Sequence, residues 1–157
     1  MIQIIFLYLL ALVWLAFATV QDWKTREIAD GLNFSLIIFA LGFRFFYSLF
    51  VDAGFAFFYQ GLIGLVIFFV IGNVLYYSRF FAGGDAKLMI ALGAILPFSY
   101  GFFNNLQIYL WFLVIFFLAA AIYSIGSSLW LSLINFKKFK IMFKKLSSSM
   151  PDVILND

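Results

Sequence analysis

The 157-residue chain contains no cysteine and no histidine, and these two absences limit the chemistry open to it. Without cysteine there is no thiol nucleophile and no disulfide, and without histidine there is no imidazole base. The commonest zinc ligands are missing for the same reason. Charged residues are also scarce, at 11% of the chain, compared with about 25% in a typical soluble domain. Any proton-transfer chemistry therefore falls to the seven aspartates and glutamates.

Apolar residues are abundant: 66% of the chain is hydrophobic, 23% is aromatic and the mean hydropathy is +1.11. A soluble domain of this size has too large a surface to bury so much apolar material. Membrane lipid removes that difficulty, because it solvates apolar side chains. The formal net charge of +3 is small, and we expect no nucleic-acid partner. The composition indicates an integral membrane protein.

Several apolar stretches approach the roughly 20 residues that a helix needs to cross a bilayer. In chain order, the first three cover about residues 2–20, 32–50 and 55–76, and the fifth covers about residues 106–134. The fourth lies between them: it starts near Leu88 and weakens between Pro97 and Asn105. We therefore predict an all-α, polytopic helical bundle of about five spans, or six if Pro97 splits one of them. Residues 1–135 would form the transmembrane domain, and residues 136–157 a basic cytoplasmic tail.

The basic residues predict how the bundle is oriented. With five spans, nine of the ten lysines and arginines fall on one side of the membrane. These are Lys24, Arg26, Arg79, Lys87 and the tail lysines 137, 138, 140, 144 and 145, whereas Arg44 lies toward the other side. Positive charge accumulates in cytoplasmic loops. The N-terminus is therefore predicted outside and the C-terminus inside.

Two segments allow a second interpretation. Ala16-Phe17-Ala18 resembles a signal-peptide cleavage site, but no basic residue precedes the apolar stretch, so we expect the first span to be retained. The tail alternates basic and apolar residues from Phe136 to Leu146. It is either a simple positive-inside stop or an interfacial helix lying on anionic lipid.

Two aspartates stand out by their position in this topology. Asp22 ends the first span and Asp85 begins the fourth, so the chain crosses twice between them and both lie at the cytoplasmic face. When two carboxyls are close together, one stays protonated while the other is ionised. Such a pair can activate water and protonate a carbonyl without a metal. The pattern therefore favours aspartic-protease chemistry.

Each of these residues also has a purely structural interpretation. Asp85 would open a helix, where an acidic residue can cap the free N–H groups. Asp22 would be an ordinary charge at the membrane interface. Gly83 and Gly84 would either let the backbone approach a substrate closely or simply break the chain between two helices.

The two segments together resemble a known family. The motif Asp22-x-Lys24-x-Arg26-x-Ile28 is followed two spans later by Gly83-Gly84-Asp85-Ala86-Lys87-Leu88. This pair is similar to the motifs of type IV prepilin peptidases and archaeal preflagellin peptidases, which are membrane aspartyl proteases. Their first aspartate lies six residues before an isoleucine, and their second ends a G-x-G-D motif that continues x-K-L.

The match departs from the family pattern at three positions. Ala82 replaces the first glycine of G-x-G-D, Ala29 replaces a proline, and Asp30 replaces an asparagine. Asp30 makes a second candidate for the first catalytic acid. We favour Asp22, because Asp30 stands where the family has a polar, non-catalytic residue.

The resemblance implies an endopeptidase that cuts the basic leader from prepilin-like or prearchaellin-like precursors at the cytoplasmic face of the plasma membrane. Asp22 and Asp85 would be catalytic, with no metal and no cofactor. Gly83 and Gly84 would give the substrate backbone room. Lys87, Glu27 and Asp30 would have supporting roles. Glu27 or Asp30 could attract a basic leader. Lys87, like Lys24 and Arg26, also suits a role in topology or in lipid headgroup contacts. Bacterial members of the family often carry a Cys-rich cytoplasmic domain and also methylate the new N-terminus. This chain has no cysteine, so we expect no methyl transfer.

Three other functions fit parts of the pattern. A presenilin-type intramembrane protease also uses G-x-G-D, but its usual Tyr-Asp motif is missing and Trp23 follows the first aspartate. A small transporter or channel would use the acids as ion sites, although such acids usually lie deeper in the membrane. A non-enzymatic subunit of a secretion apparatus would tolerate the loss of either aspartate.

Overall fold

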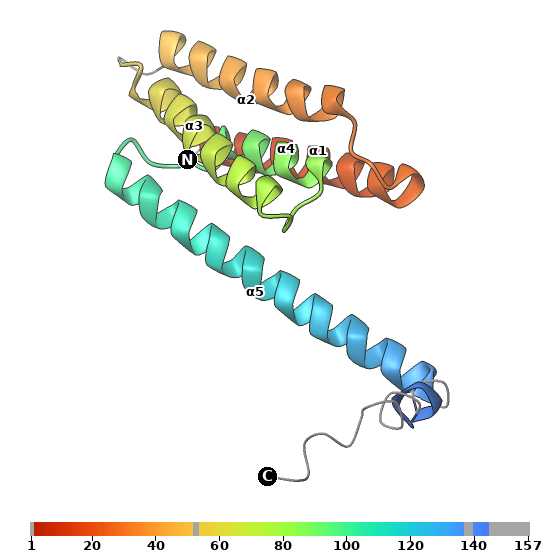
Figure 1. Cartoon of the computed structure of the whole chain (residues 1–157). Helices are drawn as coiled ribbons and strands as arrows, with labels where there is room; N and C mark the ends of the chain where they lie inside the picture. Colours follow the sequence, from red (N-terminus) through yellow and green to blue (C-terminus); the bar gives the residue numbers. More distant parts are fainter. Residues whose placement is uncertain (1, 52–53, 137–139, 145–157) are drawn as a thin grey trace. The chain divides into compact units, whose positions relative to one another are not determined.

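The computed structural model describes residues 2–51, 54–136 and 140–144. Five helices follow one another along this part of the chain: α1 (Ile2–Thr25), α2 (Asp30–Phe50), α3 (Ala56–Tyr77), α4 (Gly83–Gly93) and α5 (Phe102–Ile134) (Figure 1). The predicted all-helical class is thereby confirmed. Most of the predicted basic tail, residues 137–139 and 145–157, lies outside the described residues, as do residues 52–53 of the predicted break between spans two and three.

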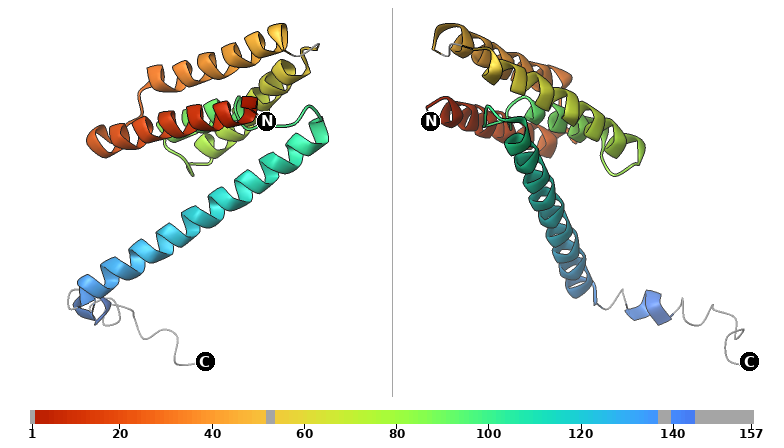
Figure 2. Two further views of the ribbon diagram at one scale, coloured as in Figure 1. Left: turned by 180° about the vertical axis from the view of Figure 1, so that it is seen from behind. Right: turned by 90° about the vertical axis from the view of Figure 1, so that its left-hand side faces the viewer.

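The chain divides into two compact units, Met1–Trp111 and Phe112–Asp157. The first unit contains α1 to α4 and the beginning of α5. In it α2 packs against α1, α3 and α4, and α3 also packs against α4. These four helices, red to green in Figures 1 and 2, gather around one apolar core.

Four of the five helices are long and apolar enough to cross a membrane: α1, α2, α3 and α5. The fourth predicted span is different, because α4 has only 11 residues. At about 1.5 Å per residue it is roughly 16 Å long, about half the hydrocarbon thickness of a bilayer. The polytopic bundle is confirmed, but only four described helices have the length of a span, one fewer than the sequence predicted.

The early end of α4 follows from its sequence. Gly93 is its last residue, and glycine destabilises a helix because it has the most conformational freedom to lose. Pro97 follows four residues later, and a proline disfavours helical backbone at the residue before it, here Leu96. The chain continues through residues 94–101 without a helix, yet Ala94, Ile95 and Leu96 are buried.

One face of α2 supplies much of the packing. Its buried residues are Asn33, Leu36, Ala40, Arg44 and Ser48, spaced three or four apart. This spacing places them in a single stripe along the helix. Leu36 and Ala40 join the apolar core. The other three are polar, so the buried face of α2 carries hydrogen-bonding groups into the bundle.

Helices α3 and α4 pack at backbone distance through glycine. A Cβ built at Gly64 would lie 2.2 Å from the carbonyl oxygen of Gly93. A Cβ at Gly93 would lie 2.5 Å from the Cβ of Phe68 and 2.6 Å from the carbonyl oxygen of Gly64. Small residues allow such close helix contacts in membrane proteins. The position of α4 against α3 therefore depends on both glycines.

Arg44 holds the non-helical segment that follows α4. It is fully buried, and its guanidinium donates to the carbonyl oxygens of Ala94, Ile95, Pro97 and Phe57, at 2.6–3.0 Å. The guanidinium carbon also lies 4.3 Å from the centre of the Phe57 ring, a cation–π distance. Carbonyls at a helix C-terminus have no partners within the helix and carry partial negative charge. Arg44 thus supplies donors to carbonyls at the C-cap of α4, Ala94, and in the segment just after it.

The surface of the bundle is largely apolar. Large hydrophobic side chains are exposed on every long helix, including Leu9, Ile38, Val66 and Trp111 at 57–68% exposure. A soluble protein rarely exposes contiguous apolar patches of this extent. Lipid contact accounts for this surface and agrees with the four candidate spans.

Candidate active site

The C-terminal end of α1 carries Asp22 and leads into a short, tightly held loop, residues 26–29. Arg26 donates its backbone N–H to the carbonyl of Asp22 at 2.8 Å and adopts a left-handed φ of 58°. A residue with left-handed backbone angles commonly follows the end of a helix. Gln21 accepts the backbone N–H of Ala29 at 3.2 Å through its side-chain oxygen, which holds the loop against the helix.

The start of α4 meets this loop at Gly84. A Cβ at Gly84 would lie 3.2 Å from both the backbone nitrogen and the Cβ of Ile28, whereas a Cβ at Gly83 would meet nothing closer than 3.7 Å. Gly84 therefore lets the 26–29 loop approach α4, and the close neighbour is the chain's own Ile28. Neither glycine has a positive φ. The chain turns into α4 with ordinary backbone angles.

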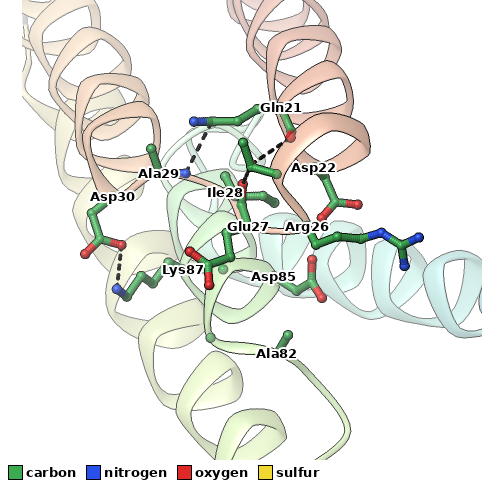
Figure 3. A pocket seen from close by; sticks show the side chains of 13 residues that line it. Gln21, Asp22, Arg26, Glu27, Ile28, Ala29, Asp30, Ala82, Asp85 and Lys87 are labelled. Atoms are coloured by element: carbon green, nitrogen blue, oxygen red, sulfur yellow. Dashed lines mark hydrogen bonds and ion pairs between the residues drawn. The ribbon is translucent and has the colours of Figure 1, made fainter.

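Asp22 and Asp85 line the same pocket, at the meeting point of the 26–29 loop and the start of α4 (Figure 3). The cavity has a volume of about 730 Å³. Asp22 comes from the last turn of α1 and Asp85 from the first turn of α4. In Figure 3 the Asp22 side chain is seen above, and the Asp85 side chain below, the side chain of Arg26. The topology thus brings together residues that are two spans apart in the sequence.

The environment of Asp85 favours its protonated form. The residue lies outside the four membrane-spanning helices, and its pKa is raised, first by partial burial and second by the charge of Asp22. A hydrogen bond from the backbone of Ala82 opposes this shift and lowers the pKa. Ala82 is the N-cap of α4, so the bond back to it is half of a capping box. Asp85 therefore stabilises its helix as well as facing Asp22.

Asp30 is engaged elsewhere in the same pocket. Its carboxylate forms an ion pair with Lys87 at 2.5 Å, and both side chains are about half exposed. The pair links the start of α2 to α4. Glu27 also lines the pocket and has no such ion pair among the described residues. Of the two candidates for the first acid, Asp22 is the one that interacts electrostatically with Asp85.

The arrangement suits general acid–base chemistry on a peptide bond. A protonated Asp85 can donate to a carbonyl oxygen while an ionised Asp22 accepts a proton from water, or the roles can be exchanged within the coupled pair. No group of three or more acidic residues in the described ranges could hold a metal ion. The catalytic and supporting assignments themselves stay predictions.

Sequence reasoning missed two buried polar residues of α2. Arg44 was interpreted as a charge near the opposite membrane face, and Asn33 was not singled out at all. Both belong to the stripe that also contains Leu36 and Ala40. The three- and four-residue spacing was the available signal, because it places both polar side chains on the face that α2 turns toward the bundle.

Comparison with known proteins agrees with the motif. The preflagellin peptidases of Methanococcus maripaludis and Methanocaldococcus jannaschii are 33% and 30% identical over 90 residues, which is 57% of this chain and 38% of theirs. That of Methanococcus voltae is 29% identical over 102 residues, 64% of this chain and 42% of its own. No solved structure gives a significant match.

The chain spans only about two fifths of the length of these curated relatives. The model of the type IV leader peptidase family, by contrast, matches residues 9–125 and so includes both aspartates and all of α2, α3 and α4. Because that match covers most of the chain, this protein belongs to the type IV leader peptidase family.

Proposed function

We propose that this chain is a membrane aspartyl endopeptidase that removes the leader of preflagellin-like or prepilin-like precursors. The observation that carries the proposal is the shared pocket of Asp22 and Asp85 in a member of the leader peptidase family. The three relatives are named preflagellin peptidases, which favours precursors of that kind. The pocket contains the paired carboxyls that hydrolysis without a metal needs.

Cleavage would take place at the cytoplasmic face of the plasma membrane. The positive-inside pattern supports this side, because Lys24, Arg26, Arg79 and Lys87 all flank the loops that form the pocket. The pocket lies at the ends of α1 and α4, and the exposed apolar surfaces of α1, α2 and α3 would be in lipid. A substrate anchored in the same membrane would present its cleavage site at this level.

Co-expression with a candidate precursor tests this function. Membranes containing wild-type protein should convert the precursor to a faster-migrating product. Asp22→Asn and Asp85→Asn should each abolish the conversion, because each leaves the pair without one of its two proton-transfer groups. Asp30→Asn should retain measurable processing, since Asp30 is paired with Lys87. Processing by either Asp22→Asn or Asp85→Asn would rule out the aspartyl mechanism.

A further inference from the structure

A second pocket lies next to the candidate active site, between α2, α3 and α4. Its volume is about 380 Å³. The lining is mostly apolar, with Phe34 and Ile37 from α2, Leu65 and Phe69 from α3, and Ile90 from α4. Its shape and chemistry suit apolar side chains rather than a polar or charged ligand.

Asn33 also lines this pocket and is its unusual feature. It is 3% exposed, and neither its Nδ2 nor its Oδ1 has a hydrogen-bond partner among the described residues. Buried polar groups are nearly always hydrogen-bonded, so an unpaired amide calls for an explanation. A carboxamide both donates and accepts, as does a peptide group. A polypeptide backbone can pair with both ends of Asn33, whereas a lipid acyl chain can pair with neither.

The apolar pocket adjoins the pocket of Asp22 and Asp85. Lys87 lines both pockets, and its partner Asp30 lines the pocket of the two aspartates. A peptide that is cut beside Asp85 and continues past Lys87 therefore enters an apolar environment. The adjoining pocket thus fits the part of a membrane-anchored substrate that runs from the scissile bond toward its apolar membrane segment.

We propose that the apolar pocket binds the apolar residues of the precursor next to the scissile bond, with the Asn33 amide hydrogen-bonded to the precursor's backbone. This inference rests on the proposed function and names the part of the substrate that the enzyme holds. Asn33 is then a specificity residue: it aligns the peptide and takes no part in bond cleavage.

Replacing Asn33→Leu tests the amide. The change removes an unpaired buried amide, so the thermal unfolding midpoint should not fall. The kcat/KM for the precursor should fall about tenfold, mainly through KM, because about two hydrogen bonds to the substrate are lost. Ser48→Ala is the matched control. The Ser48 hydroxyl on α2 is also buried and has no hydrogen-bond partner in the described part of the chain, but it lies outside the pocket. The Ser48→Ala variant should process the precursor like wild type.

Wild-type kinetics for Asn33→Leu, or a loss matched by an equal fall in thermal stability, would overturn the assignment of Asn33. Failure of wild-type protein to cleave the precursor would instead count against the proposed function. The two failures are therefore distinguishable within one set of membranes.

Photo-crosslinking tests the pocket as a whole. Benzoylphenylalanine would be placed at Phe69, inside the pocket, or at the neighbouring Val70, outside it. The Asp85→Asn background would be used, because this variant should leave the precursor uncleaved. Both positions are 57% exposed, so general accessibility is the same. We expect precursor crosslinks from position 69 and few from position 70. Equal crosslinking at both positions, or lipid adducts alone at position 69, would contradict the inference.

Discussion

At the scale of single residues, Asp85 combines a structural and a chemical role. Its bond to the backbone of Ala82 caps α4, and its partial burial and the nearby Asp22 carboxylate both favour the protonated state. The two interpretations made from the sequence, cap and catalytic acid, are therefore compatible. The hydrogen bond with which Asp85 caps α4 also holds its carboxyl group in place near Asp22.

The raised pKa of Asp85 predicts a pH-dependent effect of Asp85→Asn on stability. The folded-state pKa lies above the unfolded-state value, so at pH about 7 the ionised carboxylate disfavours the folded state. This penalty vanishes as the pH falls below the unfolded-state value of about 3.9. Asp85→Asn should therefore unfold at a higher temperature than wild type near neutral pH, with the difference shrinking on acidification. A lower midpoint for the variant at neutral pH would contradict the shift.

Much of the candidate site could be predicted at this scale, and the physical reason is simple. Asp22 and Asp85 flank two spans, and an even number of crossings returns the chain to the same side of the membrane. The role of Gly84 against Ile28 could not be predicted, because it depends on a distance between segments more than 50 residues apart in the sequence. The Asp30–Lys87 pair has the same origin: only the packing of α2 on α4 brings its charges together.

At the scale of helices, α4 is the element that differs most from its prediction. Hydropathy alone marks an apolar stretch and cannot tell a short helix followed by buried irregular backbone from a full span. Hydropathy does not show which donors pair with the backbone carbonyls of the irregular segment. Irregular backbone at membrane depth is tolerated only when it is buried in protein and its polar groups are paired. Arg44 meets that condition through residues 94–97.

Replacing Arg44→Met should therefore destabilise the bundle strongly. Four buried carbonyl oxygens would lose their donor, and each unpaired buried group costs about 1–3 kcal/mol, so a total loss of about 3 kcal/mol or more is expected. Arg44→Lys should be intermediate, because an ammonium has three donors and no planar fork. Unfolding of the purified variants in detergent would measure both. Stability equal to wild type in Arg44→Met would show that the four bonds contribute little.

The contact between α3 and α4 gives a second prediction for helix packing. Gly93→Ala should cost about 2 kcal/mol by overpacking, because its Cβ would lie 2.5 Å from the Cβ of Phe68. Gly42→Ala is the matched control, since a Cβ at Gly42 would meet nothing within 4 Å and glycine is unfavourable inside a helix. Unfolding midpoints should fall for the first variant and stay level or rise for the second. The reverse order would disprove the close packing.

At the scale of the whole molecule, composition alone predicts an integral membrane protein. No water-soluble fold of 157 residues could bury its side chains when 66% of them are hydrophobic. The structure agrees: its long helices carry exposed apolar side chains on the outside and polar groups within. The number of spans was harder to predict, since it depends on local backbone pairing around Arg44. The orientation in the membrane follows from charge distribution and stays a prediction.

Cysteine labelling can test that orientation cleanly, because the natural chain has no cysteine. Ser78→Cys lies just after α3, on the side of the candidate site, and Gly54→Cys lies between α2 and α3 on the opposite side. A membrane-impermeant maleimide should label position 54 in intact cells and position 78 only after permeabilisation. The opposite pattern would place the pocket outside the cell and contradict the predicted topology.

The partners of Arg44 have a consequence for how this fold varies among relatives. All four of its acceptors are main-chain oxygens, and every amino acid supplies the same oxygen at positions 57, 94, 95 and 97. Positions 94, 95 and 97 can therefore change in evolution without loss of these hydrogen bonds, whereas position 57 also contributes its ring to the contact and position 44 cannot change. A search for pairs of positions that mutate together would therefore find no correlated partner for Arg44 among positions 94, 95 and 97, although this arginine connects α2 to the segment after α4.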